Sequence, residues 1–234
     1  MSLPQLNTPT YSLSLPSTGQ EVRYRPFLVK EQKLLLLANE SKNMKESNTA
    51  VIKIIDNCTF GKLDVNNLPT FDVEYIFIKL RAKSVGESVE LSLVCPDDEE
   101  TKVTQKINLD EIKVQFFEEH SKEIKVTDNV KLILDYPKLN DMLGLQNKNE
   151  IELVFHILSK CIKEIHNGDD IINRIDFSDT DLDNFIGQMT TSQFELVTSF
   201  FNTMPKLTHS ITVKNPKTGV EGEVKVEGLQ NFLA

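Results

Sequence analysis

The side chains that metal chemistry would need first, those of cysteine and histidine, are few and widely spaced. They are Cys58, Cys95, Cys161, His120, His156, His166 and His209. A structural zinc site needs about four such ligands, usually in close pairs. Cys161 and His166 are five residues apart on a predicted helix and face different ways, and Cys95-Pro96 has no second cysteine nearby. We therefore expect Cys161 to be a small buried hydrophobe, Cys95 to be structural, and the chain to hold no metal.

Two groups of carboxylates have spacings that acid–base or calcium chemistry uses. The paired acids are Asp97-Asp98-Glu99-Glu100 and Asp179 with Asp181 and Asp183. An overlapping second set, Asp176, Asp179 and Asp181, has calcium-loop spacing. Glycosidases need two carboxylates in a cleft with unlike environments, whereas these lie in charged, turn-like sequence. The second set resembles a calcium loop only faintly, because the glycine and the distal glutamate of that loop are missing. The sequence predicts that both groups are solvated surface acids.

No motif of nucleotide binding or hydrolysis accompanies these residues. The nine glycines are scattered and form no phosphate-binding loop. Gly-x-Ser-x-Gly and His-Glu-x-x-His are both absent. The sequence therefore predicts a protein that is not an enzyme, uses no cofactor and has no small-molecule substrate.

Arg23, Arg25 and Arg81 are the candidates for contacts with other proteins. A guanidinium group is planar and binds carboxylates through two parallel hydrogen bonds, which suits it to joining strands or chains. Two interpretations remain open for each arginine: an ion pair within the chain, which we favour, or a contact with a partner.

Composition excludes several classes of partner. The 234 residues carry a formal net charge of -9, and no basic run offsets it. Nucleic-acid binding depends on lysine and arginine at phosphates, so we expect no nucleic acid as partner, and no anionic membrane surface. No apolar run approaches the roughly 20 residues that span a bilayer.

Cysteine usage indicates the compartment. The count of three is odd and the sequence shows no signal-peptide pattern, so we expect a reducing compartment.

The elements that must position these residues follow from the hydrophobic periodicity. Alternating residues predict a hairpin over 11–24, and helical spacing predicts helices over 30–42, 47–57 and 71–82. Short Val- and Ile-rich runs predict an antiparallel meander over 87–134. One apolar face from Ile151 to Ile165 predicts a further helix that ends before Gly168. Ser178 and Thr190 start two more helices, the second with a capping-box pattern.

Strands and helices are segregated in this order, which predicts an α+β fold. It has an N-terminal hairpin with helices, a central antiparallel β-meander, and C-terminal helices closed by a β-hairpin. We expect one or two compact domains, built from four segments: 1–86, hairpin plus helices; 87–136, meander; 137–207, helical; and 208–234, hairpin and short terminal helix.

The C-terminal stretch from His209 to Ala234 has the form of a metal-binding knuckle without its cysteines. Two alternating runs flank the turn Asn215-Pro216-Lys217-Thr218-Gly219. Without metal, packing of Val213 and Val224 must hold the hairpin. We expect the end of the chain to be anchored by three apolar residues, Leu229, Phe232 and Leu233. A terminal apolar segment frays unless it is docked, either on its own domain, which we favour, or on a neighbouring chain.

Four stretches resemble the baseplate hub proteins of T-even-type contractile-tailed bacteriophages, also called hub subunit or hub assembly proteins. They are LPSTGQEVRYRPFLVKEQKLLLLANES (15–41), LPTFDVEYIFIKLRAKSVGE (68–87), CPDDEE leading to INLDEIKV (95–114), and FFNTMPKLTHSI with the terminal EGLQNFLA. Members of that family carry a Cys-Pro-x-Cys-Gly knuckle just before a Gly-Leu-x-x-Phe-Phe ending. Here Asn215 and Thr218 replace both sulfur ligands, so the resemblance does not extend to a metal.

The resemblance implies a non-enzymatic protein of tail morphogenesis that contacts other baseplate hub and tail proteins. It would be found in the virion, at the tail baseplate, or in the host cytoplasm during assembly. A homo-oligomer within a symmetric baseplate is compatible with it. Two alternatives stay open: an assembly chaperone that is absent from the finished virion, and a hydrolase with an unrecognised acidic site.

Overall fold

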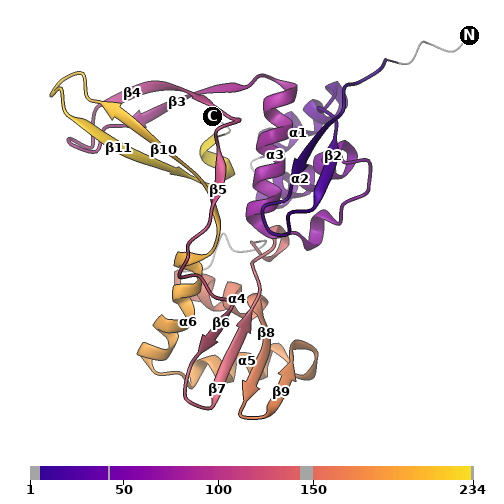
Figure 1. The fold of residues 1–234 in the computed structure, drawn as a ribbon, viewed down its shortest axis with the longest axis vertical. Coiled ribbons are helices and arrows are strands. Elements are labelled where there is room, and N and C mark those ends of the chain that lie inside the picture. Colours follow the sequence, from indigo (N-terminus) through magenta and orange to yellow (C-terminus); the bar gives the residue numbers. More distant parts are fainter. Residues whose placement is uncertain (1–5, 42, 143–149, 233–234) are drawn as a thin grey trace, which may run out of the picture. The chain divides into compact units, whose positions relative to one another are not determined.

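The computed structural model describes residues 6–41, 43–142 and 150–232. The chain forms two compact units, which Figure 1 shows as ribbons. Unit 1 comprises residues 1–115 and 206–234, and unit 2 comprises residues 116–205, inserted between them. The described elements are mixed helices and small antiparallel sheets, which confirms the predicted α+β class.

Unit 1 begins with the predicted hairpin. Strand β1 (Tyr11–Ser14) pairs antiparallel with β2 (Glu21–Tyr24) and places Leu13 opposite Val22. Both of these side chains are buried, while their neighbours along each strand are exposed. The alternation therefore puts one face of the hairpin into the core of unit 1.

The hairpin is followed by the predicted helices. They are α1 (Val29–Ser41), α2 (Met44–Cys58) and α3 (Thr70–Ser84), and a 3-10 turn that was not predicted, η1 (Val65–Asn67), lies between α2 and α3. The Asn43 side chain accepts a hydrogen bond from the Lys45 N–H and caps the start of α2. Helix α3 has Ile76, Phe77 and Ile78 fully buried, so it is the central helix of unit 1 rather than a surface helix.

Two small sheets complete unit 1. One is the pair β3 (Ser88–Val94) and β4 (Lys102–Asn108), and the other joins β10 (Lys206–Lys214), β11 (Glu221–Glu227) and β5 (Lys113–Gln115), before the 3-10 turn η4 (Leu229–Phe232). Strand β3 alternates buried and exposed residues along its whole length. The chain leaves unit 1 at the end of β5 and returns to it at the start of β10. Because β10 pairs with β5, these two points lie on neighbouring strands.

Unit 2 packs helices around one four-stranded antiparallel sheet. The strands lie in the order β6 (Glu123–Lys125), β7 (Val130–Leu134), β8 (Ile162–Asn167) and β9 (Asp170–Asn173), and the remaining elements are η2 (Leu139–Met142), α4 (Glu150–Cys161), η3 (Arg174–Asp176), α5 (Asp179–Gly187) and α6 (Thr191–Thr203). Ser178 and Thr190 each form a capping box with the third helical residue; both helix starts were predicted, and the capping box was predicted at Thr190. Leu132, Leu158, Val197 and Phe200 lie in the core that these elements share.

The structure differs from the sequence prediction within 137–207, which was expected to be helical but also contains strands β8 and β9. The helix expected from Ile151 to Ile165 ends at Cys161, and Ile162–Asn167 continues directly as strand β8. The Cys161 carbonyl accepts a hydrogen bond of 2.7 Å from the Asp135 N–H, and β8 then pairs with β7. Cross-strand pairing thus satisfies the backbone of a β-branched segment whose side-chain spacing also fits a helix.

The strands expected within 87–134 are all formed, but three separate sheets share them. Strands β3 and β4 pair with each other, β5 pairs with β10 from near the end of the chain, and β6 and β7 belong to unit 2. Long-range partners decide this arrangement, and hydrophobic alternation carries no information about which strands pair.

Three turns share one backbone geometry: Leu15–Gly19, Cys95–Glu99 and Asn215–Gly219. In each, proline is the second residue and the N–H of the fifth residue donates to the carbonyl of the first, at 2.8, 3.0 and 2.8 Å respectively. The fifth residue always has a positive φ, of 72°, 55° and 76°. Glycine fits that conformation in two of the turns, whereas in the central turn it is imposed on a glutamate.

Candidate functional site

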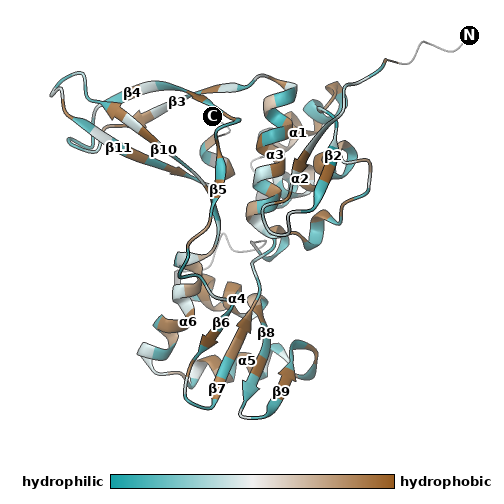
Figure 2. Ribbon diagram, viewed as in Figure 1, coloured by the Kyte–Doolittle hydropathy of each residue, from teal (hydrophilic) through white to brown (hydrophobic). Residues whose placement is uncertain are grey.

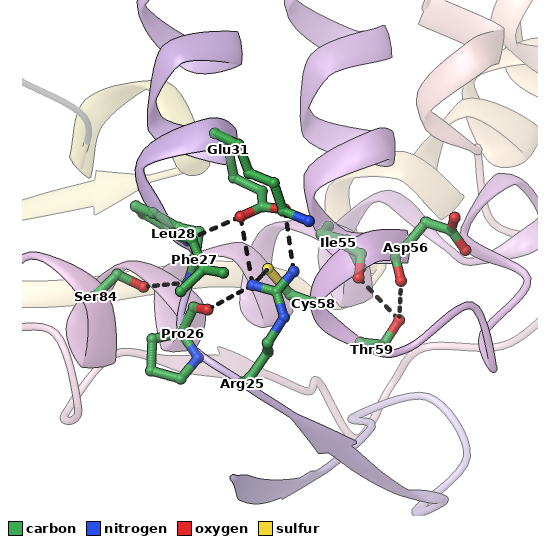
Figure 3. Close-up of polar contacts among 11 residues, drawn as sticks. Arg25, Pro26, Phe27, Leu28, Glu31, Ile55, Asp56, Cys58, Thr59 and Ser84 are labelled. Atoms are coloured by element: carbon green, nitrogen blue, oxygen red, sulfur yellow. Dashed lines mark hydrogen bonds and ion pairs between the residues drawn. The ribbon is translucent and has the colours of Figure 1, made fainter. Parts of the chain in front are cut away.

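Arg25 forms an ion pair inside unit 1. Its guanidinium contacts both carboxylate oxygens of Glu31, at 3.0 Å (Nη2 to Oε1) and 3.4 Å (Nη1 to Oε2), as Figure 3 shows. The Glu31 side chain is fully buried, and it also accepts a hydrogen bond from the Leu28 N–H at 2.8 Å. Burial raises the pKa of Glu31, but the hydrogen bonds from Arg25 and Leu28 outweigh it and lower that pKa overall. The intramolecular interpretation therefore accounts for Arg25.

The same arginine joins the hairpin to the end of α2. Its backbone N–H donates to the Cys58 carbonyl at 3.0 Å, and its Nη1 lies 3.7 Å from the Cys58 sulfur (Figure 3). Cys58 is fully buried, and this burial raises the pKa of its thiol to about 11. The thiol is thus protonated at neutral pH and is not a nucleophile. Arg25 instead fixes β2 against the turn that follows α2.

That turn presents an exposed aromatic side chain in an unusual conformation. Phe60 and Gly61 both have positive φ, 63° and 64°, and Phe60 is 49 % exposed. A bulky residue pays a conformational cost of about 1–3 kcal/mol in such a region, and residues of this kind cluster at functional sites. Sequence reasoning missed Phe60, although Thr-Phe-Gly at the end of a predicted helix is a recognisable signal.

Arg23 lies next to this turn, across a pocket. The pocket has a volume of about 510 Å³ and is lined by Thr10, Gln20, Glu21, Val22, Arg23, Thr59, Phe60, Lys62 and Leu63. Arg23 is exposed, and within the described part of the chain its guanidinium has no ion-pair partner. The lining contains neither histidine nor cysteine. An exposed arginine and an exposed aromatic ring beside a hollow form a surface suited to a protein contact; we call Arg23, Phe60 and this pocket the hairpin surface.

Arg81 and the end of the chain meet on α3. The Arg81 Nη1 donates to the Phe232 carbonyl at 3.0 Å, and Glu74, two turns earlier in α3, accepts a hydrogen bond from the Leu229 N–H at 3.2 Å. Phe232 is fully buried and Leu229 is 7 % exposed. The terminal segment therefore docks on its own unit, and Leu233 lies outside the described residues. Of the residues predicted for partner contacts, Arg25, Arg81, Leu229 and Phe232 are engaged within unit 1, and Arg23 is exposed.

Hydrogen bonds join the C-terminal turn to the acidic turn between β3 and β4. Asn215 Nδ2 donates to both carboxylate oxygens of Asp97, at 2.9 and 3.1 Å, and Thr218 Oγ1 donates to Asp97 Oδ2 at 2.5 Å. These bonds hold the pKa of Asp97 below its usual range, with Thr218 contributing most. Cys95, at the start of the acidic turn, is fully buried.

The paired turns are held to each other by direct hydrogen bonds. Among the described residues there is no group of three or more His, Cys, Asp or Glu side chains placed to hold a metal ion. The positions of the two missing sulfur ligands are occupied by Asn215 and Thr218, and both bind the Asp97 carboxylate directly. The fit is close, because a Cβ atom on Gly222 would lie 2.4 Å from Pro96 Cγ.

The aspartates near α5 have structural contacts. Asp181 accepts from the Ser178 N–H and hydroxyl, at 2.9 and 2.6 Å, and Asp176 accepts from the Asn173 N–H at 2.9 Å. Asp179 is paired with Arg174 and, at 3.5 Å, with Lys160. These contacts cap helical turns and pair Asp179 with two basic side chains. Asp179 and Asp183 also line a pocket of about 650 Å³, together with Glu152 and His156, and the Asp179 carboxylate in it is already held by Arg174 and Lys160.

Comparison with known proteins identifies the family. A family model described as T4 bacteriophage base plate protein matches residues 8–234, which is nearly the whole chain. No curated protein and no solved structure matches the chain. No helix in the described ranges is long and apolar enough to cross a membrane. With both the hairpin surface and the paired turns inside the matched range, the chain belongs to the T4 bacteriophage base plate protein family.

Proposed function

We propose that this chain is a structural and assembly protein of the central hub of the phage tail baseplate, and that it works through protein–protein contacts without catalysing a reaction. The observation that carries the proposal is the family match over residues 8–234, because membership implies a structural role in the baseplate. The hub assignment is supported by the resemblance of 15–41 and 68–87 to hub proteins.

The hairpin surface is the part of unit 1 that we assign to a neighbouring baseplate protein. Interface energy is concentrated in a few aromatic and arginine side chains near pockets, and Phe60 with Arg23 has that composition. The buried contacts of Arg25 support this role, because they hold the two sides of the pocket together before a partner binds. A surface organised in advance loses less conformational entropy on association.

The proposal is tested by blocking production of this chain during infection and counting tails by electron microscopy. We expect filled heads without complete tails, and restoration of tails when the natural chain is supplied. A double variant, Arg23→Ala with Phe60→Asn, should restore fewer tails although its melting temperature is unchanged; asparagine is chosen because it tolerates a positive φ. Val85→Ser, which also removes an exposed apolar side chain, is the control and should restore tails fully. A normal number of tails in the absence of the chain would refute the proposal.

A further inference from the structure

The outer strand of the unit 2 sheet exposes an unusual amount of apolar surface. Strand β9 pairs only with β8 among the described strands and forms one edge of the sheet (Figure 1). Its centre is hydrophobic (Figure 2), with Ile171 58 % exposed and Ile172 38 % exposed, and Ile175 just beyond it is 92 % exposed. Proteins normally protect a sheet edge with charges, proline or a covering element, because an open edge pairs with other chains.

A pocket opens on one face of this edge. It has a volume of about 310 Å³, and its lining residues come from β7, β8, β9 and α5 with the segment before it: Val130, Ile165, Asn167, Ile172, Phe177, Asp181, Leu182 and Phe185. The strand register places Ile172 opposite Ile165 on the pocket side, and Ile171 opposite His166 on the other face. A strand added to β9 would therefore direct alternate side chains toward the pocket and toward Ile171.

The charge around this edge is strongly negative. Unit 2 contains 16 acidic and 8 basic residues, whereas unit 1 contains 19 and 18, so nearly all of the net charge lies in unit 2. Within residues 169–183 there are six aspartates and one arginine. That arginine, Arg174, is already paired with Asp179 and lies 5.1 Å from the centre of the Phe177 ring. Asp170 and Asp176 lie before and after the isoleucines, so acidic groups flank the apolar edge on both sides.

We propose that the β9 edge and its pocket bind an extended segment of another baseplate protein, in which apolar residues are flanked by lysine or arginine. The open edge selects an extended chain, the pocket selects apolar side chains, and the flanking aspartates select basic ends. A nucleic acid would be repelled by the same charge. The inference rests on the proposed function for the identity of the partner as a baseplate protein, but the recognition chemistry rests on unit 2 alone.

The test uses the full chain with carbon-13-labelled isoleucine methyl groups and the synthetic peptide Lys-Lys-Val-Leu-Val-Leu-Lys-Lys. We expect NMR shifts at Ile165, Ile171 and Ile172, none at Ile76 and Ile78 in the core of unit 1, and weaker binding as salt rises from about 0.05 to 0.5 M. The matched peptide with glutamate in place of every lysine should not bind.

Two protein variants make the test specific. Ile171→Ser with Ile175→Ser changes only exposed side chains, so the fold should persist, and the dissociation constant should rise about tenfold or more. Leu36→Ser with Leu37→Ser, on the exposed part of α1, should leave binding unchanged.

Three results would overturn the proposal: equal binding of the glutamate peptide, NMR shifts spread evenly over both units, or unchanged binding by the Ile171→Ser, Ile175→Ser variant. Self-association through this edge, seen by sedimentation of the free chain, would overturn it in favour of a second copy as occupant. If the peptide does not bind but tails still depend on the chain, the baseplate function stands and only the proposed binding at the β9 edge is rejected.

Discussion

Arg23 and Arg25 lie two positions apart, yet their environments are opposite. Arg25 is 11 % exposed and neutralises the buried Glu31, whereas Arg23 is exposed beside a pocket. Sequence reasoning found both residues because arginine suits carboxylate recognition, but it left open whether each binds inside or outside the chain. The alternation of the four-residue strand β2 was too short to decide this for Arg25, which lies just beyond its end.

Removal of Arg25 should destabilise unit 1 strongly. Arg25→Ala leaves the buried Glu31 carboxylate with only the exposed Lys30, whose Nζ lies 3.5 Å away, so the loss should fall near the lower end of the about 3–5 kcal/mol that breaking a buried ion pair typically costs. Urea unfolding measures the loss, with Arg23→Ala as the matched control, for which we expect a change within about 0.5 kcal/mol. Equal effects of the two variants would contradict the assignment of Arg25 as structural and Arg23 as a surface residue.

His120 should be neutral at physiological pH. Burial, and secondarily the nearby Lys122, lowers its pKa below 6.5, and its ring packs against both Tyr136 and Phe200, with centroid distances of 5.5 and 4.9 Å. The unfolded chain therefore binds the proton more tightly, so the stability of unit 2 should fall as pH drops below about 6.5. Following the His120 ring proton by NMR gives the pKa directly, and His120→Phe should remove this part of the pH dependence. A titration midpoint above 6.5 would be inconsistent with the buried ring.

At the scale of elements, the three proline turns show that backbone conformation recurs where side chains differ. Leu15–Gly19, Cys95–Glu99 and Asn215–Gly219 have the same hydrogen bond and the same positive φ at the fifth residue. The first and third turns were predictable from glycine after proline. The pairing of the second and third through Asp97 was not, because the two turns are 118 residues apart in sequence.

Glu99 is the one of these fifth residues that is not glycine, and its replacement should stabilise the chain. An L-residue in the left-handed region is strained, so Glu99→Gly should gain about 0.5–1 kcal/mol after the greater flexibility of unfolded glycine is counted. Gly219→Ala should lose a similar amount, since its Cβ would meet no atom within 4 Å and only strain changes. Thermal unfolding of the two variants measures both changes in stability. A loss of stability in Glu99→Gly would show that the glutamate side chain makes a stabilising contact.

The hydrogen bonds between the paired turns should make the stability of unit 1 fall in acid. The pKa of Asp97 is lowered in the folded state, so its contribution is complete above the unfolded value of about 4 and is lost as pH falls through the folded value. Asn215→Ala removes a buried amide donor and should cost about 1–3 kcal/mol of stability at neutral pH. On going to acid pH, the variant should lose less additional stability than the natural chain does. Because these bonds use no metal, a chelator should leave the melting temperature unchanged. A clear drop with chelator would instead point to a bound ion.

Helix α4 shows why one predicted boundary failed. The apolar spacing from Ile151 to Ile165 fits a helix, and residues three apart would point to opposite faces of a regular strand. An irregularity in the pairing of β8 with β7, between the partners of Ile133 and Leu134, nevertheless leaves both Ile162 and Ile165 buried. The pairing of β8 with β7 and β9 depends on residues far along the chain, so local periodicity could not exclude it. The capping residues Ser178 and Thr190, by contrast, act through neighbours three positions away and were predicted correctly.

At the scale of the whole molecule, the two units differ in charge more than in architecture. Unit 1 is nearly balanced and unit 2 carries twice as many acidic as basic residues. The overall charge of -9 was evident in the sequence, but its segregation required the knowledge that residues 206–234 belong with residues 1–115. This division gives the protein two unlike surfaces, the hairpin surface of unit 1 and the acidic, apolar edge of unit 2, as expected of a component that contacts more than one neighbour.

Mass spectrometry of purified, finished phage particles tests the central claim most directly. The chain is quantified against an abundant tail protein in several independent preparations. A structural protein of the baseplate should be present at the same ratio in every preparation, because an assembled tail has a fixed composition. Absence from the particles, together with abundance in the lysate of infected cells, would contradict the structural role and make the chain an assembly factor that leaves before the tail is complete.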